Sequence, residues 1–295
     1  RYFASEGFLP GYNFTKLPQR AILQYRDKED SIETISRARS LALREFGPQN
    51  IIYNNGRKFR VKRMRLSGNG AERHKFYYNP RTGFLLKDRE NADTHIDIIT
   101  GEALHGVTKL VPGFCTQAEE MVAEEMERIT CQEEERSRKS YKTDTYFACD
   151  DPQSISESEL KLADSHLANI RYIPSCRITY ILSSKNDENI NGFPFDSRTG
   201  EWISLDRTNT LRQHEQEHPE DAGRLQFVKL FTEMTANAIY IQPSETLGLA
   251  DKNAVRTFLY AIKQAIEDVF QVEGNEIGGE IMGEGSKPNI FIYEN

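Results

Sequence analysis

Residues 51–61 are Ile51-Ile52-Tyr53-Asn54-Asn55-Gly56-Arg57-Lys58-Phe59-Arg60-Val61. An asparagine followed by a glycine tolerates the positive φ angles of a two-residue turn, and apolar residues alternate with basic ones after it. The stretch therefore predicts an antiparallel β-hairpin. A short helix is predicted before it, at about Ala38 to Phe46, and Gly47-Pro48 is a typical helix end.

Two further turns share the tripeptide Arg-Thr-Gly. One is Asn79-Pro80-Arg81-Thr82-Gly83, between the apolar stretches 76–78 and 84–86, and the other is Asp196-Ser197-Arg198-Thr199-Gly200, between 193–195 and 201–203. Both loops need a residue that tolerates positive φ before the chain returns, so turn chemistry explains the similarity without an internal repeat.

Helices and strands alternate irregularly in the remainder. Apolar residues at helical spacing predict a charged helix from about Thr116 to Glu135 and a long amphipathic helix from Lys252 to Gln271. The latter carries a stripe that must pack on a sheet or a partner: Val255, Phe258, Leu259, Ile262, Ala265, Ile266, Val269 and Phe270. Strands are predicted at 166–173, 177–183, 226–231 and 238–242.

These elements predict an α+β protein, with antiparallel hairpins in the N-terminal half and a mixed sheet packed by the long helix in the C-terminal half. The polar segment Asp150 to Glu159 is the predicted boundary between two domains. We expect residues 1–150 to form a hairpin-rich accessory domain with a charged helix, and residues 151–295 to form an α/β helicase-associated domain that is incomplete at its end.

Composition argues against several classes of protein. The 295-residue chain has a net charge of −7, so any surface for nucleic acid must be local. It contains neither a signal peptide nor an apolar run long enough for a bilayer, so we expect a cytoplasmic protein without a membrane partner.

Its four cysteines, Cys115, Cys131, Cys149 and Cys176, form no CxxC pair, so no metal site is expected. From the residues at both ends, we expect the chain to be a segment of a larger protein.

One basic stretch stands out in this acidic chain. Arg57, Lys58, Arg60, Lys62, Arg63 and Arg65 lie within nine residues, and Arg37 and Arg39 lie on or beside the preceding helix. Strand alternation would place Phe59 and Val61 on one face and Lys58, Arg60 and Lys62 on the other, as a cationic row suited to a phosphate backbone. The alternative is a solvated strand that pairs with the many acidic residues.

Motifs for catalysis are weak. His214-Glu215-Gln216-Glu217-His218 matches the HExxH zinc pattern, but its flanks carry no apolar stripe and Pro219 disfavours helical angles at His218, so a solvated acidic loop is expected. Gly278 and Gly283 have phosphate-loop spacing but lack the lysine that must follow. We therefore expect no catalytic residue, and a zinc hydrolase is the weakest hypothesis.

Several stretches together resemble the region that follows the motor in large DEAD/DEAH-type helicases. The resemblance is strongest to the helicase subunits of DISARM anti-phage systems, and weaker to bacterial repair helicases with the same C-terminal domain. The stretches that carry it are Phe8–Phe14, Ser36–Pro48, Asn50–Gly56, Glu127–Arg136, Arg198–Trp202 and Ile290–Asn295. The four-cysteine zinc cluster of the repair-type relatives is not matched by the cysteine spacing here.

The resemblance implies a motor N-terminal to Arg1, which would hold ATP and Mg²⁺, whereas this segment would need no cofactor. It implies an ATP-dependent DNA helicase or translocase in anti-phage defence as the parent protein. Expected partners are single-stranded or forked DNA and a second DISARM subunit. The rival hypothesis is a protein-interaction platform that docks a partner subunit without contacting DNA.

Overall fold

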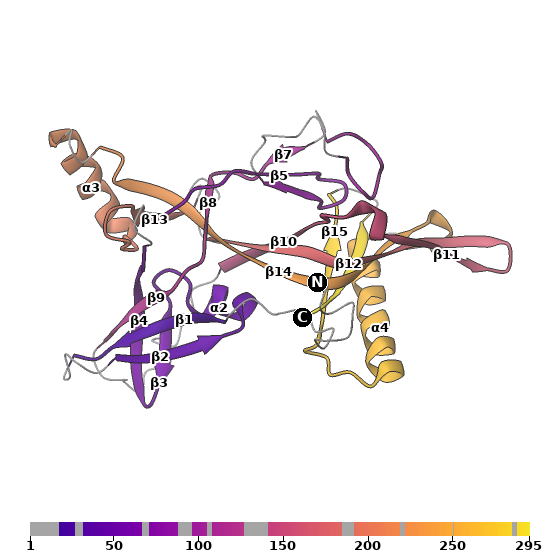
Figure 1. The fold of residues 1–295 in the computed structure, drawn as a ribbon, viewed down its shortest axis with the longest axis horizontal. Coiled ribbons are helices and arrows are strands. Elements are labelled where there is room, and N and C mark those ends of the chain that lie inside the picture. The colour runs from indigo at the N-terminus through magenta and orange to yellow at the C-terminus, as the bar shows by residue number, and fades with distance from the viewer. Residues whose placement is uncertain are drawn as a thin grey trace, which may run out of the picture.

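The structure is a computed structural model that describes residues 18–26, 32–66, 71–87, 96–104, 108–126, 141–184, 192–218, 222–249, 251–284 and 288–295. Strands dominate it and form three sheets, and two long curved strands run through the largest of them (Figure 1). The predicted α+β class is confirmed. No described helix combines the length and the apolar character that a bilayer crossing requires.

The first sheet, sheet A, has five strands in the order β2-β1-β9-β4-β3. Their bounds are β1 Gln19–Gln24, β2 Ile32–Arg37, β3 Ile51–Asn54, β4 Arg57–Met64 and β9 Met121–Glu125. The β3–β4 hairpin is confirmed, with Asn55 at φ 48° and Gly56 at φ 73°. However, β1 runs parallel to β9, so this half of the chain forms a mixed sheet and not only antiparallel hairpins.

The predicted first helix is confirmed as α2, Arg39–Glu45. It buries Ala42 and Leu43, which join the core below sheet A together with Ala21 and Leu23 of β1. Helix α2 therefore covers the inner face of sheet A and leaves the opposite face uncovered by this element.

The second sheet, sheet B, has eight strands. Its main path is β10-β12-β14-β16-β15, with β11 beside β12 and with β13 and β8 beside β14. The bounds are β8 Phe114–Gln117, β10 Tyr141–Ala148, β11 Ser156–Leu162, β12 Ser165–Ser184, β13 Phe193–Asp196, β14 Leu225–Pro243, β15 Ile277–Met282 and β16 Asn289–Glu294. Strands β8 and β10 precede the predicted domain boundary at Asp150, so that boundary falls inside one sheet.

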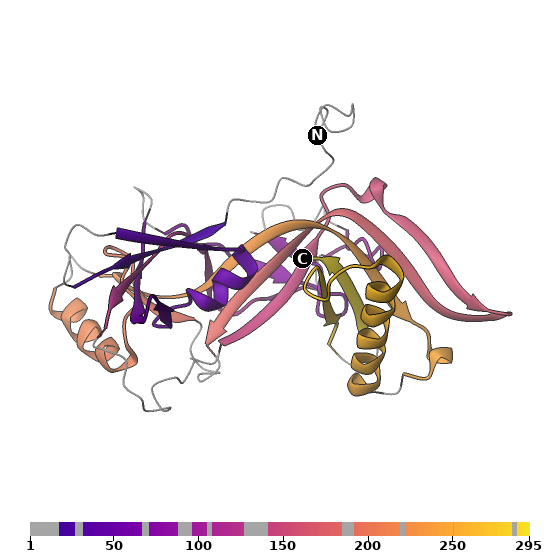
Figure 2. The same cartoon turned by 90° about the horizontal axis from the view of Figure 1, so that it is seen from below.

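Two other sequence-based predictions need correction here. The predicted helix from Thr116 is wrong up to Glu125, because this segment forms the end of β8 and all of β9; its remainder, 127–135, lies outside the described residues. The strands predicted as 166–173 and 177–183 are one strand, β12, interrupted only by an irregularity in its register between Ile173 and Cys176. Strand β14 likewise unites two predicted strands, and both curve through the molecule (Figure 2).

The long helix is confirmed as α4, Lys252–Phe270. The Asp251 carboxylate caps it by accepting hydrogen bonds from the backbone N–H groups of Asn253 and Ala254, both at 2.8 Å. Its buried residues Val255 and Leu259 pack on Ile290, Ile292 and Ile241 of sheet B. The apolar stripe is nevertheless shorter than predicted, because Ala265 is exposed, and so are Val269 and Phe270.

A third sheet, sheet C, contains β5 Phe76–Tyr78, β6 Leu85–Lys87 and β7 Lys109–Leu110. The predicted hairpin of β5 and β6 is confirmed, and its turn matches the one after β13. In both turns the first side chain accepts a backbone N–H two residues later, Arg81 to Asn79 at 3.0 Å and Arg198 to Asp196 at 2.9 Å. The glycines that close them have nearly equal φ angles, 78° and 77°.

The second turn supplies a pH-dependent contribution to stability. Burial would raise the pKa of Asp196, but hydrogen bonds from Arg224 at 2.8 Å and from the backbone of Arg198 and Thr199 outweigh it and lower that pKa. A depressed carboxyl pKa stabilises the fold above its unfolded value of about 3.9 and loses this contribution as the pH falls through the folded value.

We expect Asp196→Asn to lower the free energy of unfolding by about 1–3 kcal/mol at pH 7, because the neutral amide replaces one acceptor oxygen of the carboxylate with an NH2 donor and removes the charge that pairs with Arg224. The difference from the unsubstituted chain should shrink as the pH falls below about 4. Urea unfolding at several pH values measures it. A difference that stays constant down to the lowest pH at which the chain folds would contradict this assignment.

Candidate nucleic-acid interface

Strand β4 carries the basic stretch through the middle of sheet A. Phe59 and Val61 are fully buried, and Arg60 and Lys62 are half-buried on the opposite side, as alternation predicts. Lys58 is an exception, because its side chain is only 7% exposed. Lys58 therefore cannot present its ammonium group to a phosphate at the surface, and its predicted role is corrected.

A bulge changes the end of this strand. The pairing of β4 with β9 shifts between Val61 and Arg63, so β4 has one extra residue at this point, Lys62, that has no partner in β9. Val61 and Met64 on either side of the bulge are both buried. Lys62 and Arg63 between them consequently lie together on the outer side of the sheet, and Arg63 is exposed. Its guanidinium lies 3.4 Å from the side-chain oxygen of Gln24.

Three of the predicted arginines form ion pairs with carboxylates. Arg57 pairs with Glu125 at 2.8 Å and lies over the Tyr25 ring at 5.2 Å, on the inner side of the sheet. Arg65 pairs with Glu120 at 3.0 Å, and Arg37 pairs with Glu45 of α2 at 3.0 Å. The remaining predicted residue, Arg39, is half-buried at the start of α2. The structure does not bring Arg37, Arg39 and Arg57 to the outer face beside Arg60, and Arg65, although exposed, is paired with Glu120.

One cation on this side was not predicted. Arg20 is exposed in β1, between the buried residues Gln19 and Ala21. Alternation of buried and polar residues in this segment is the signal that could have identified it. We call the set Arg20, Arg60, Lys62 and Arg63 the outer cations of sheet A. Within the described part of the chain, none of the four is in an ion pair, although Glu124 stands opposite Arg60 in the register.

The HExxH segment is helical, contrary to the predicted loop. It ends α3, Leu205–Glu217, which consists largely of good helix formers and has Asp206 in its first turn. His218 is the C-cap at φ −125°, so the predicted departure from helical angles there is confirmed. The rings of His214 and His218 stack at 4.4 Å. One carboxylate oxygen of Glu215 accepts a hydrogen bond from the Leu225 backbone N–H at 2.6 Å.

No described residues form a group of three or more histidine, cysteine or acidic side chains suited to a metal ion. The described cysteines, Cys115, Cys149 and Cys176, are free thiols, and Cys131 lies outside the described residues. Burial raises the pKa of the Cys115 thiol to about 12, although Lys229 nearby opposes the shift. Burial likewise raises the pKa of Cys176. Neither buried thiol is therefore activated as a nucleophile.

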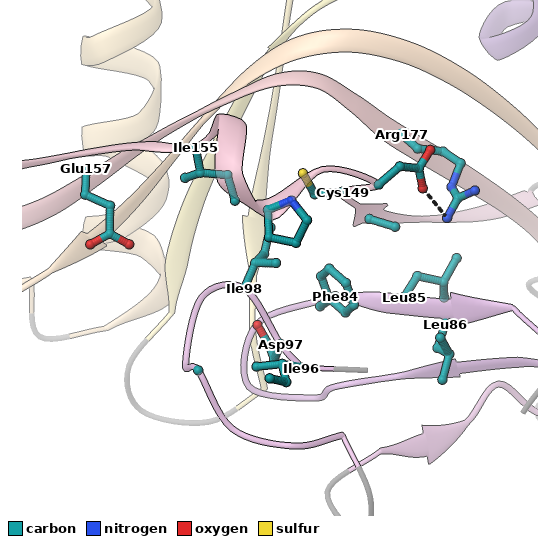
Figure 3. A pocket seen from close by; sticks show the side chains of 14 residues that line it. Phe84, Leu85, Leu86, Ile96, Asp97, Ile98, Cys149, Ile155, Glu157 and Arg177 are labelled. Atoms are coloured by element: carbon teal, nitrogen blue, oxygen red, sulfur yellow. Dashed lines mark ion pairs between the residues drawn. The ribbon is translucent and has the colours of Figure 1, made fainter. Parts of the chain in front are cut away.

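A hollow of about 580 Å³ lies between sheet C and the chain that connects β10 to β11 (Figure 3). Its floor is apolar and includes Phe84 and Ile98, and Cys149 and Ile155 face it from the connecting segment. At one end Arg177 pairs with Asp150 at 3.1 Å. The lining of the hollow also includes the charged residues Asp97, Asp150 and Glu157, so apolar and polar side chains share it.

Comparisons with known proteins find little. No family model matches the sequence, and no curated protein matches it. A solved structure described as the crystal structure of DUF1998 helicase MrfA bound to DNA is similar, with a TM-score of 0.33 and 10% identity over 94% of this chain. The chain spans about a quarter of that protein, since the match covers 26% of it. A TM-score of this size does not establish a common fold.

Proposed function

We propose that this chain is a non-motor accessory segment that engages DNA for an ATP-driven helicase or translocase, through the outer face of sheet A. The observation that carries the proposal is the group of outer cations, Arg20, Arg60, Lys62 and Arg63, on a face that α2 leaves uncovered. Cations along a strand can bind successive phosphates, and such interactions supply affinity without sequence preference.

The resemblance of the sequence to DISARM helicase subunits supports the wider setting. In that setting the parent protein acts in anti-phage defence, and ATP and Mg²⁺ bind in a motor outside this chain. The net charge of −7 makes a local patch the appropriate form of such a surface, because the rest of the chain would repel DNA.

The test replaces two outer cations, as Arg60→Glu with Arg63→Glu, and measures binding of the 295-residue chain to single-stranded and forked DNA at several salt concentrations. We expect weaker binding to all sequences alike. The log–log salt slope should also flatten by about 0.7–0.9 for each phosphate that is no longer neutralised. Lys58 is left unchanged because it is buried.

The matched control is Lys252→Glu with Arg256→Glu, which makes the same change in net charge on exposed positions of α4. It should alter binding much less than the sheet A variant. Circular dichroism checks that both variants are folded. Equal reductions in affinity for the two variants, or no binding by the unsubstituted chain at low salt, would contradict the proposal.

A further inference from the structure

Two of the described cysteines lie opposite each other where β10 ends. Strands β10 and β12 are antiparallel, and the last pair in their register is Ala148 opposite Arg177. The next residue along β10 is Cys149, and the next residue back along β12 is Cys176. A contact agrees with this register, since the Sγ atom of Cys176 lies 3.5 Å from the carbonyl oxygen of Ala148, in the peptide group that leads to Cys149.

The side chains of both cysteines lie on the core face of sheet B. Residues that stand opposite each other on antiparallel strands direct their side chains to the same face. Cys176 is fully buried in the main hydrophobic cluster, and Cys149 packs against that cluster. On its other side Cys176 stands opposite Ala236 of β14, so no bulky neighbour on that strand competes with Cys149 for the space beside Cys176.

The spacing of such a pair suits a disulfide bond. Opposite residues of antiparallel strands have Cα atoms about 4.5–5.5 Å apart, and disulfides join Cα atoms that are about 4.4–6.8 Å apart. The electrostatics of the pair agree with this proximity. Burial raises the pKa of Cys176, and a negative charge on Cys149 raises it further. In the structure both cysteines are free thiols, so it describes the reduced form of the pair.

The two thiols differ in their access to solvent. Cys149 is half-buried and lines the hollow shown in Figure 3, whose volume of about 580 Å³ can hold a small molecule. Burial raises the pKa of Cys149, whereas the guanidinium of Arg177 at the same hollow opposes the shift. Cys176 lies behind it with no exposed surface. A reagent in solution therefore reaches Cys149 first.

We propose that Cys149 and Cys176 are a reversible dithiol–disulfide pair, which a low-molecular-weight disulfide oxidises from the hollow. The Cys149 thiolate attacks one sulfur of that compound, whose S–S bond breaks and releases one small thiolate. Cys176 then loses its proton and attacks the Cys149 sulfur of the mixed disulfide, and the second small thiolate leaves. The two released thiolates take up the two protons from the cysteines, so two electrons pass from the protein to the small disulfide.

The second step proceeds although Cys176 is buried. A thiolate at Cys149 raises the pKa of Cys176, and this charge is gone once Cys149 carries the mixed disulfide. The attack is also intramolecular, between groups that the β10–β12 register already holds together, and such an arrangement compensates for a small fraction of thiolate.

The bond would act on the wall of the hollow. It ties β12 to β10 where the chain leaves β10 for the short 3-10 helix Pro152–Ser154, and Pro152 lines the hollow. Oxidation would thus fix one side of the hollow and close a covalent loop that contains β11. Neither cysteine belongs to the outer cations of sheet A, so the inference does not depend on DNA binding.

The test treats the folded 295-residue chain with oxidised glutathione, alkylates the remaining thiols in urea, and maps the cysteines by trypsin digestion and mass spectrometry. The chain carries Cys131→Ser, because Cys131 lies outside the described residues. We expect the peptide 143–161, with Cys149, to be joined to the peptide 172–177, with Cys176, until dithiothreitol separates them. Cys115, which is buried in another cluster, is the internal control and should be alkylated in full.

Two serine variants separate the steps. Cys176→Ser should stop at a glutathione adduct on Cys149, whereas Cys149→Ser should leave Cys176 unmodified because the reagent does not reach it. Oxidation should raise the urea midpoint of the chain that has both cysteines, since the bond restricts its unfolded state. The same treatment should leave the midpoint of Cys149→Ser unchanged.

The proposal fails if the chain with both cysteines keeps glutathione on Cys149 while Cys176 stays free, or if Cys149 becomes joined to Cys115. It fails equally if the bond between Cys149 and Cys176 forms only at urea concentrations that unfold the chain, because the folded register would then not hold the two thiols together.

Discussion

Replacement of Phe147 by alanine is expected to lower the free energy of unfolding by about 3–5 kcal/mol. The side chain is fully buried at the end of β10. Its ring stacks on Phe291 of β16 at 5.0 Å, and it meets Tyr240 of β14 at 5.3 Å and Phe84 beside β6 at 5.7 Å. One residue therefore joins three strands of sheet B to sheet C, and its removal leaves a cavity that none of these strands can fill independently.

Urea unfolding followed by circular dichroism measures this cost. The matched control is Phe270→Ala, because Phe270 is 70% exposed at the end of α4 and should change the stability little. Phe147→Leu should fall between the two, since leucine fills part of the cavity. Similar losses of unfolding free energy for the Phe147 and Phe270 alanine variants would mean that Phe147 is not buried against β14 and β16 as the structure shows.

Local chemistry explains the elements that the sequence predicted correctly. The β3–β4 hairpin follows from Asn55 and Gly56, and α4 follows from its apolar spacing and from Asp251 as its cap. These signals lie within a few residues of one another. They act before distant parts of the chain meet, so they can be recognised without knowledge of the tertiary structure.

The segment after Thr116 shows where such signals fail. Its apolar residues fit a helical stripe, but Met121, Val122 and Ala123 are consecutive and all buried in β9. Strand β9 lies in the middle of sheet A between β1 and β4, and even Val122, which stands opposite the exposed Arg63, is only 6% exposed, so its pattern lacks the alternation that identifies a half-exposed strand. The strands beside it lie far away in the sequence, so the segment alone cannot indicate them.

The candidate interface was predicted only in part for a related reason. Alternation correctly separates Arg60 from Phe59, but it cannot indicate the bulge that adds Arg63 to the outer face or the burial of Lys58. Nor can it indicate which arginines meet a carboxylate. Arg57 and Glu125 are 68 positions apart, and their pairing depends on the alignment of β4 with β9.

Gly200→Ala is expected to cost about 3–5 kcal/mol, because it combines two penalties. Gly200 has φ 77°, where an L side chain is strained, and a Cβ there would lie 2.2 Å from the carbonyl oxygen of Met64. That carbonyl belongs to β4, and the Gly200 carbonyl accepts the Met64 N–H at 2.8 Å. The turn after β13 is therefore fitted closely against sheet A, and a methyl group would force the two apart.

Gly56→Ala is the matched comparison, since Gly56 has a similar φ of 73° but no atom within 4 Å of an added Cβ. It should cost only about 1 kcal/mol, the strain of the backbone angle. The single tryptophan, Trp202, is 1% exposed and donates its backbone N–H to Lys62 at 2.8 Å, so its fluorescence reports the same junction. A red-shifted emission in Gly200→Ala and not in Gly56→Ala would place the damage between sheets A and B, whereas equal costs without a shift would mean that the turn is not packed against β4.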